Sequence, residues 1–150
     1  MGRYVSIELR RFVAERAERI CEYCLIHEQD TYAGCQIDHV ISEKHNGLTA
    51  ADNLAFACAL CNRHKGTDVG SIVHATNTFV RLYNPRIDQW SQHFKLDGPR
   101  ILSLSEIGEV TVKILRFNDD QSVEERQLLL SIGRYPSPAA LRRIPLSIEP

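Results

Sequence analysis

Apolar residues recur every three or four positions at the start of the chain. The stripe runs from Leu9 to Ile20, and Ser6 stands ahead of it as a suitable helix N-cap. This pattern predicts an amphipathic helix over residues 6–20. Four arginines lie mainly off the apolar stripe, and we interpret them as a solvated helix face rather than as contacts to DNA: Arg10, Arg11, Arg16 and Arg19.

Two short apolar runs follow, separated by a polar segment. The run QIDHVI predicts a strand over residues 36–41, and alternating apolar positions predict a second strand over 54–58. Asn46 and Gly47 lie between the strands and are a strong turn signal. A helix should begin near residue 60 and pause near residue 66. The predicted order of this region is therefore strand, loop, strand, helix.

The period of the pattern changes in the second half of the chain. Residues 71–100 have mixed character and predict a loop with short helical pieces. Residues 101–104 and 109–117 are rich in β-forming residues, and the second stretch alternates cleanly, so both are expected to be strands. Residues 123–132 predict a short helix. Residues 136–150 contain four of the six prolines and are expected to be an extended or flexible tail.

Length and composition narrow the class of protein. A chain of 150 residues that is 43% apolar and 25% charged suits one folded domain. We expect a core over about 18–70, an extension over about 71–135 and then the tail. No apolar run approaches the length of a membrane span, and the charged N-terminus lacks the apolar region of a signal peptide. These features predict a cytoplasmic protein without a membrane partner.

The charge distribution limits how tightly the chain should bind an anionic partner. The formal net charge is −1, which gives no global sign of nucleic-acid binding. Residues 21–70 carry three Lys or Arg against seven Asp or Glu, whereas the segments on either side are modestly basic. Binding to a phosphate backbone should therefore be weak, sensitive to salt and assisted by metal.

Four of the five cysteines form two C-x-x-C pairs. The pairs are Cys21 with Cys24 and Cys58 with Cys61, and 33 residues separate them. Disulfides are rare in the cytosol, so this spacing predicts a structural zinc site with four thiolate ligands. Redox-active pairs and free core thiols are the alternatives. Cys35 has no partner in this pattern, and we interpret it as a small core residue.

A second constellation lies between and beside the cysteine pairs. Asp38 and His39 are adjacent, Asn53 follows Asp52, and Asn62 follows the last cysteine directly. Over residues 21–66 this arrangement resembles the HNH endonucleases. The resemblance implies an α+β fold with a small ββα-metal core and a four-cysteine zinc site, here preceded by a helix and followed by a β/α extension. It also implies a metal-dependent endonuclease that hydrolyses DNA phosphodiester bonds.

The resemblance assigns a role to each of these residues. His39 would be the general base that activates water, because an imidazole can take a proton near neutral pH. Asp38 and Asn62 would hold the catalytic metal, and oxygen ligands favour Mg²⁺ or Mn²⁺. Asn53 would organise the loop around the base. Because neighbours on a strand face opposite ways, placing Asp38 and His39 at one site requires a strand end or a bulge.

The partner implied is DNA, in its double-stranded form. Lys65 matches a lysine of the family pattern, and with Arg63 it is expected to contact a phosphate. A chain with one site would need a homodimer or two encounters to cut both strands. Two other classes of function stay open. One is a non-catalytic zinc-ribbon module that binds nucleic acid or protein, and the other is a thiol–disulfide protein.

Overall fold

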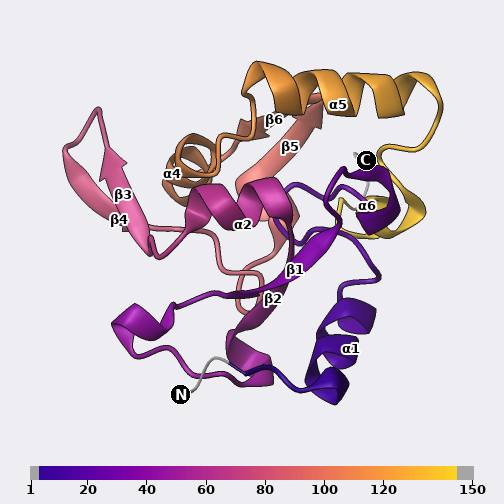
Figure 1. The fold of residues 1–150 in the computed structure, drawn as a ribbon. Helices are drawn as coiled ribbons and strands as arrows, with labels where there is room; N and C mark the ends of the chain where they lie inside the picture. Colours follow the sequence, from indigo (N-terminus) through magenta and orange to yellow (C-terminus); the bar gives the residue numbers. More distant parts are fainter. Residues whose placement is uncertain (1–3, 145–150) are drawn as a thin grey trace, which may run out of the picture.

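The structure is a computed structural model that describes residues 4–144. Short helices and three separate two-stranded antiparallel sheets alternate along the chain, so the α+β class is confirmed (Figure 1). None of the helices in the described part of the chain has the length and apolarity needed to cross a membrane. The first elements are α1 (Ile7–Arg16), β1 (Cys35–His39), β2 (Leu54–Cys58) and α2 (Ala59–Lys65), with short 3₁₀ turns at η1 (Glu28–Asp30), η2 (Glu43–His45) and η3 (Ala51–Asn53).

Helix α1 begins as predicted and ends earlier than predicted. The Ser6 side chain accepts a hydrogen bond from the Leu9 amide at 3.1 Å, which satisfies a free N–H of the first turn. The helix ends at Arg16 rather than near residue 20. Glu18 and Arg19 adopt left-handed backbone angles, with φ of 56° and 64°, and these angles cannot continue a right-handed helix.

The two predicted strands pair with each other, and a helix lies on each face of the hairpin. β1 and β2 are antiparallel, with Asp38 opposite Ala55. One face carries Ile37 and packs with α1, whereas the other face carries Asp38 and meets α2. β2 matches its predicted bounds, and α2 ends where Gly66 follows with a positive φ of 52°. The ββα core is therefore present.

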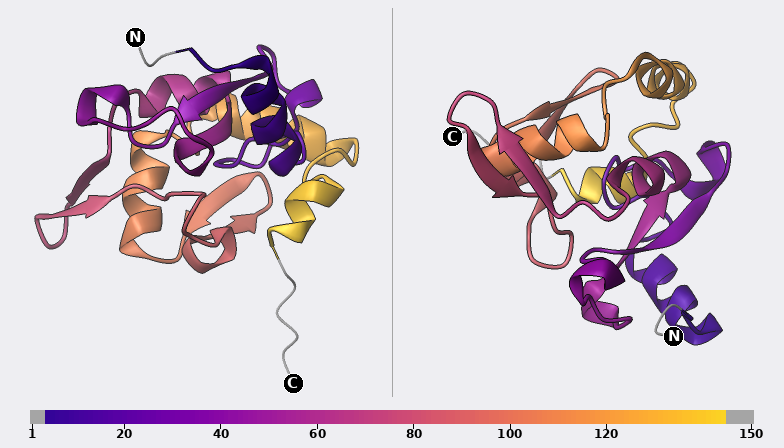
Figure 2. Two further views of the ribbon diagram at one scale, coloured as in Figure 1. Left: turned by 90° about the horizontal axis from the view of Figure 1, so that it is seen from below. Right: turned by 60° about the vertical axis from the view of Figure 1, so that its left-hand side comes forward.

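The extension contains more strand in one region and less in another than the sequence indicates. Residues 71–100, expected to be mostly loop, contribute to two hairpins, and the first hairpin projects from the body of the protein (Figures 1 and 2). Val73 is the one buried residue of its two strands, so no alternation of buried and exposed positions marks them. The elements of the extension are β3 (Gly70–Val73), β4 (Thr78–Arg81), α3 (Trp90–His93), β5 (Phe94–Asp97), β6 (Arg100–Ser103), α4 (Glu106–Ile114), α5 (Asp120–Ser131) and α6 (Pro138–Arg142).

The predicted strand over 109–117 is wrong, because this segment forms α4. The Ser105 hydroxyl accepts from the Gly108 amide at 3.0 Å and caps the helix. Val110 and Thr111 are fully buried, and Leu115 lies one turn further on the same face. The apolar residues fit a helical period as well as an alternating one, and packing selects the helix.

Two predicted elements of the C-terminal part are confirmed, and one segment of the predicted tail differs. The strand over 101–104 is confirmed as β6, and the helix over 123–132 is confirmed as α5. Residues 138–142 form α6 instead of an extended segment, and Arg142 and Arg143 both pair with Glu18. The remainder of the predicted tail, residues 145–150, lies outside the described residues.

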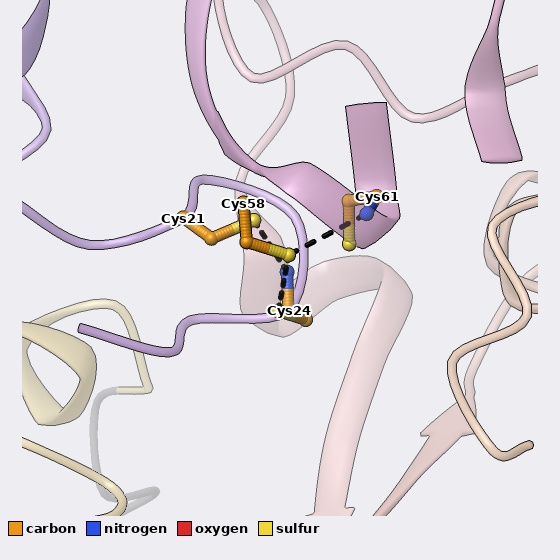
Figure 3. A group of neighbouring side chains, drawn as sticks. All are labelled: Cys21, Cys24, Cys58 and Cys61. Atoms are coloured by element: carbon orange, nitrogen blue, oxygen red, sulfur yellow. Dashed lines mark hydrogen bonds between the residues drawn. The ribbon is translucent and has the colours of Figure 1, made fainter. Parts of the chain in front are cut away.

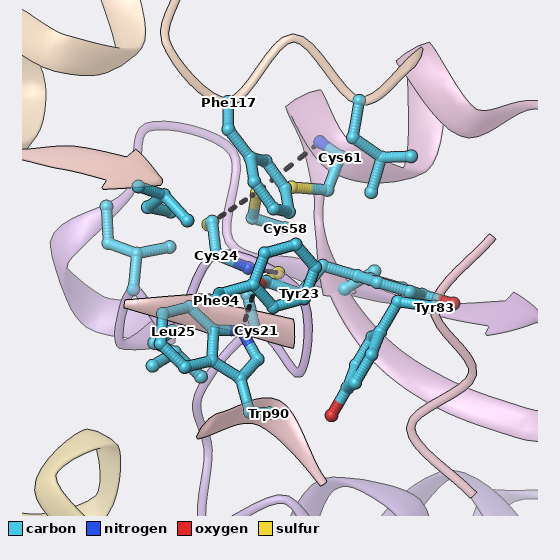
Figure 4. Close-up of a cluster of buried hydrophobic side chains, with 14 of the residues drawn as sticks. Cys21, Tyr23, Cys24, Leu25, Cys58, Cys61, Tyr83, Trp90, Phe94 and Phe117 are labelled. Carbon is cyan, nitrogen blue, oxygen red and sulfur yellow. Dashed lines mark hydrogen bonds between the residues drawn. The ribbon is translucent and has the colours of Figure 1, made fainter. Parts of the chain in front are cut away.

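One large apolar core joins the ββα unit to the extension (Figure 4). The four paired cysteines lie within it, beside a group of aromatic rings. The rings of Trp90 and Phe94 pack at 5.1 Å between centroids with their planes inclined at 40°, and Phe94 meets Phe117 edge-on at 5.6 Å. The Trp90 indole donates to the Tyr23 carbonyl at 2.8 Å, and the Tyr135 hydroxyl donates to the Cys24 carbonyl at 2.8 Å. Hydrogen bonds from the extension therefore hold the loop that carries the first cysteine pair.

Replacing Trp90 with alanine should destabilise the whole protein. The variant leaves a cavity in the core and removes the indole donor to the Tyr23 carbonyl. We expect the free energy of unfolding to fall by about 3–5 kcal/mol, measured by urea denaturation of the zinc-loaded protein. Ile87→Ala is the matched control, because Ile87 is 70% exposed. An equal, small effect of the two substitutions would contradict the role given to Trp90.

Candidate metal centre and catalytic groove

The four paired cysteines converge on one point (Figure 3). Their Sγ atoms all lie within 4.8 Å of one another, and all four residues are buried. A tetrahedral zinc ion with Zn–S bonds of about 2.3 Å separates its sulfur ligands by about 3.8 Å. The Sγ atoms of Cys24 and Cys58 are 3.7 Å apart. The geometry and the all-sulfur donor set therefore fit a structural zinc ion.

Backbone and side-chain groups around the cluster suit ligands that carry negative charge. The Cys24 amide donates to Cys21 Sγ, and the Cys61 amide donates to Cys58 Sγ, each at 3.4 Å. Buried Arg126 of α5 borders the same small cavity as three of the cysteines, Cys24, Cys58 and Cys61. Its guanidinium opposes the charge of a tetrathiolate site, because four thiolates around Zn²⁺ leave a net charge of about −2.

Cys35 stands apart from this cluster, as expected. It lies at the start of β1, half-buried, and packs against both apolar clusters. Burial raises the pKa of its thiol well above the usual range. Cys35 is therefore a protonated packing residue at neutral pH.

An open groove beside β1 and α2 collects three of the four predicted catalytic residues. Its volume is about 570 Å³, and Asp38, His39 and Asn62 line it. The chain brings Asp38 and His39 together at the C-terminal end of β1, and α2 supplies Asn62. β1 ends at His39. The strand end that the sequence analysis required for Asp38 and His39 to share one site is therefore present. Glu43 and Lys44 of η2 also line the groove.

Asp38 is a buried carboxylate with two donors. The Tyr23 hydroxyl donates to Oδ2 at 2.7 Å, and the Lys65 ammonium donates to Oδ1 at 3.2 Å. Burial is the largest influence on the Asp38 pKa and raises it, whereas Lys65 and Tyr23 oppose that rise. Tyr23 had no predicted role, although its position between Cys21 and Cys24 is a signal that it lies near the metal centre.

Lys65 is buried, whereas the sequence suggested an accessible side chain that contacts phosphate. Its side chain is only 1% exposed, and its ammonium also donates to the His39 carbonyl at 2.9 Å. The last turn of α2 faces β1, so the lysine points inward rather than toward solvent. In this structure Lys65 holds Asp38 and the end of β1, and its ammonium is not presented to a phosphate.

His39 has one ring nitrogen in a hydrogen bond within the loop that follows β1. Nε2 lies 2.9 Å from the Thr49 hydroxyl and 3.7 Å from a Glu43 carboxylate oxygen. The side chain is 19% exposed and borders the groove. Neither Thr49 nor Glu43 was singled out from the sequence, because a single threonine or glutamate in a polar loop carries no pattern.

Both the oxygen and the nitrogen of the Asn53 side-chain amide form hydrogen bonds with the backbone of the same loop. Its Oδ1 accepts from the Ile41 amide, and its Nδ2 donates to the carbonyls of Ile41 and Leu48, each at 2.9 Å. A side chain on Gly47 would approach the Ile41 carbonyl oxygen to 1.7 Å, so this turn admits only glycine. The hydrogen bonds of Asn53 are those that an organiser of the loop would make.

Asn62 and Asp38 both line the groove and carry hard oxygen atoms. Asn62 Nδ2 donates to Gln36 Oε1, which leaves the amide oxygen as the atom that could ligate a cation. Each Asp38 oxygen accepts one of the hydrogen bonds above and keeps a further lone pair. Carboxylate and amide oxygens are the kinds of ligand that Mg²⁺ prefers.

Arg63 lies in a second groove, on the other side of α2. It is exposed, as a phosphate contact requires. The groove has a volume of about 600 Å³, and Lys113 and Arg116 from the end of α4 also line it. His64 links the two helices through Nδ1, 3.2 Å from the Leu115 carbonyl. The sequence did not indicate Lys113 or Arg116, because their segment was interpreted as a strand.

Zinc should be required for stability, and the two classes of cysteine should behave differently. We expect one zinc per chain by elemental analysis, and Cys58→Ser should lose most of it, with a drop in unfolding temperature. Cys35→Ala is the control and should keep its zinc, since Cys35 lies outside the cluster. Full zinc content in Cys58→Ser, or a reactive disulfide between the pairs, would contradict the site.

Comparison with known proteins agrees with this geometry. The family model of the HNH endonucleases matches residues 21–68, a segment that contains both cysteine pairs, β1, β2 and α2. Searches of curated proteins and of solved structures each returned no match. The matched segment carries the ββα core, the four-cysteine cluster and the groove with Asp38, His39 and Asn62. Residues 21–68 of this chain are therefore similar to the HNH endonucleases, and the match covers less than half of the chain.

Proposed function

We propose that the protein is a metal-dependent endonuclease that hydrolyses phosphodiester bonds in double-stranded DNA. The observation that carries the proposal is the meeting of Asp38, His39 and Asn62 in one open groove of the segment that is similar to the HNH endonucleases. The groove contains an imidazole for proton transfer and two oxygen ligands for a hard cation. A buried lysine beside them fixes the carboxylate.

Each residue has a chemical task in this proposal. His39 accepts a proton from the water that attacks phosphorus. A divalent cation held by Asp38 and Asn62 supplies positive charge for the phosphate and for the leaving oxygen. Lys65 and Tyr23 hold Asp38 by their hydrogen bonds, and Asn53 holds the loop beside the base. A cytoplasmic location suits this chemistry, because a reducing compartment keeps the four zinc ligands as thiolates.

The second candidate is a zinc module without catalysis. The observation in its favour is the ion pair between Lys65 and Asp38, which satisfies the carboxylate without a metal. In that case the groove would bind no divalent cation, and no cleavage would occur with any metal. The exposed cations Arg63, Lys113 and Arg116 could serve either function by contacting phosphates.

Plasmid nicking tests the nuclease directly. Wild-type protein should convert supercoiled DNA to the nicked form with Mg²⁺ or Mn²⁺ and not with EDTA. His39→Ala should slow this reaction by about 10²–10⁴-fold, because it removes the general base. His74→Ala is the control, since His74 is exposed on the projecting β3–β4 hairpin. Equal rates for wild type and His39→Ala would show that His39 is not the base, or that a contaminant cuts the DNA.

Binding of DNA should depend on the second groove. In a His39→Ala background, the triple change of Arg63, Lys113 and Arg116 to glutamine should weaken binding at low salt and flatten its salt dependence. Each lost phosphate contact should lower the slope of log K against log salt by about 0.9. Lys95→Gln with Arg100→Gln is the control, because both residues are exposed on the β5–β6 hairpin. Fluorescence anisotropy measures the DNA affinity and its salt dependence. An equal loss of affinity in the triple variant and in the control would refute the role given to the second groove.

A further inference from the structure

The His39 ring meets a hydroxyl and a carboxylate on the side of its Nε2 atom. Nε2 lies 2.9 Å from Thr49 Oγ1, a hydrogen-bond distance. Glu43 Oε1 lies 3.4 Å from the same hydroxyl and 3.7 Å from Nε2. Glu43 precedes Thr49 by six residues, so one loop supplies both groups beside the proposed base.

The chemistry of these groups sets the direction of the hydrogen bonds. An ionised carboxylate only accepts, so the hydroxyl proton of Thr49 is directed to Glu43. Thr49 then has lone pairs, and no second proton, for His39. The hydroxyl therefore accepts from Nε2–H, and in the neutral ring Nδ1 is the nitrogen without a proton.

The loop that carries Thr49 is held in place by independent contacts. Asn53 bonds to Leu48, the residue before Thr49, and to Ile41 near the start of the loop. The close approach of Gly47 to the Ile41 carbonyl keeps these two backbone segments together. These contacts restrain the loop and so fix the position of Thr49 beside His39.

We propose that Thr49, with Glu43 behind it, is a positioning residue that holds His39 as the Nε2–H tautomer and presents Nδ1 as the base. For the reaction this inference rests on the proposed nuclease function. Nδ1 takes one proton from water as the water oxygen bonds to phosphorus. The bond from phosphorus to the leaving oxygen breaks, and that oxygen keeps the electron pair. The imidazolium that results retains Nε2–H beside the negative charge of Glu43.

The first measurement is the tautomer of His39, which requires no cleavage. Long-range ¹H–¹⁵N NMR at about pH 9 distinguishes the two neutral forms, and the His39 signals are those absent from His39→Ala. Wild type and Thr49→Ser should show Nε2–H alone. Thr49→Val keeps the shape and removes the hydroxyl, so it should show a mixture of the two tautomers. Glu43→Gln should keep Nε2–H, because the amide oxygen can still accept from Thr49.

The second measurement is the cleavage rate of the same variants, with zinc content and circular dichroism to confirm their fold. Thr49→Val should slow cleavage by about 10–100-fold, as loss of an orienting partner does elsewhere, without changing the metal concentration that gives half the maximal rate. Thr49→Ser should restore most of the rate. An Nδ1–H tautomer in wild type, or unchanged tautomer and rate in Thr49→Val, would overturn the inference. A wild-type chain that cuts no DNA would instead overturn the nuclease, while the NMR result still decides the role of Thr49.

Discussion

The convergence of four cysteine sulfurs is the constraint on which the rest of the structure depends. It ties the turn after α1 to the junction of β2 and α2, two places 33 residues apart in the chain. In this structure the cluster lies inside the main apolar core rather than at its edge. Zinc bound there would add its binding free energy to folding and would hold the strands and the helix in register.

The four-cysteine cluster and the groove are connected through one loop. Tyr23 stands between two zinc ligands, is fully buried, and donates to Asp38. Its backbone carbonyl accepts from Trp90, which belongs to the extension. A displacement of the zinc loop would therefore move a donor away from Asp38. Stability and the arrangement of the candidate catalytic residues have a common origin in this turn.

Burial also decides which charges serve structure and which could meet a substrate. Asp38 and Lys65 are both almost inaccessible, and each reduces the cost of burying the other. Arg63, two positions before Lys65 on the same helix, is exposed in the groove beside α4. A helix separates such neighbours by about 200°, so adjacent cations can have opposite roles.

The sequence by itself determined the ββα order, the bounds of β2 and the four cysteines that converge, and it singled out Asp38, His39 and Asn62, which line one groove. These features are local: a fixed spacing, an alternation over five residues, or a cap. Tertiary structure alone decided that residues 106–114 form a helix, that Lys65 turns inward, and that Thr49 meets His39. The apolar positions of α4 fit two periods, and only the core that receives Val110 and Thr111 distinguishes them. The contacts of Lys65 and Thr49 join residues 10 to 27 positions apart, and no short-range pattern records which side chains meet over that separation.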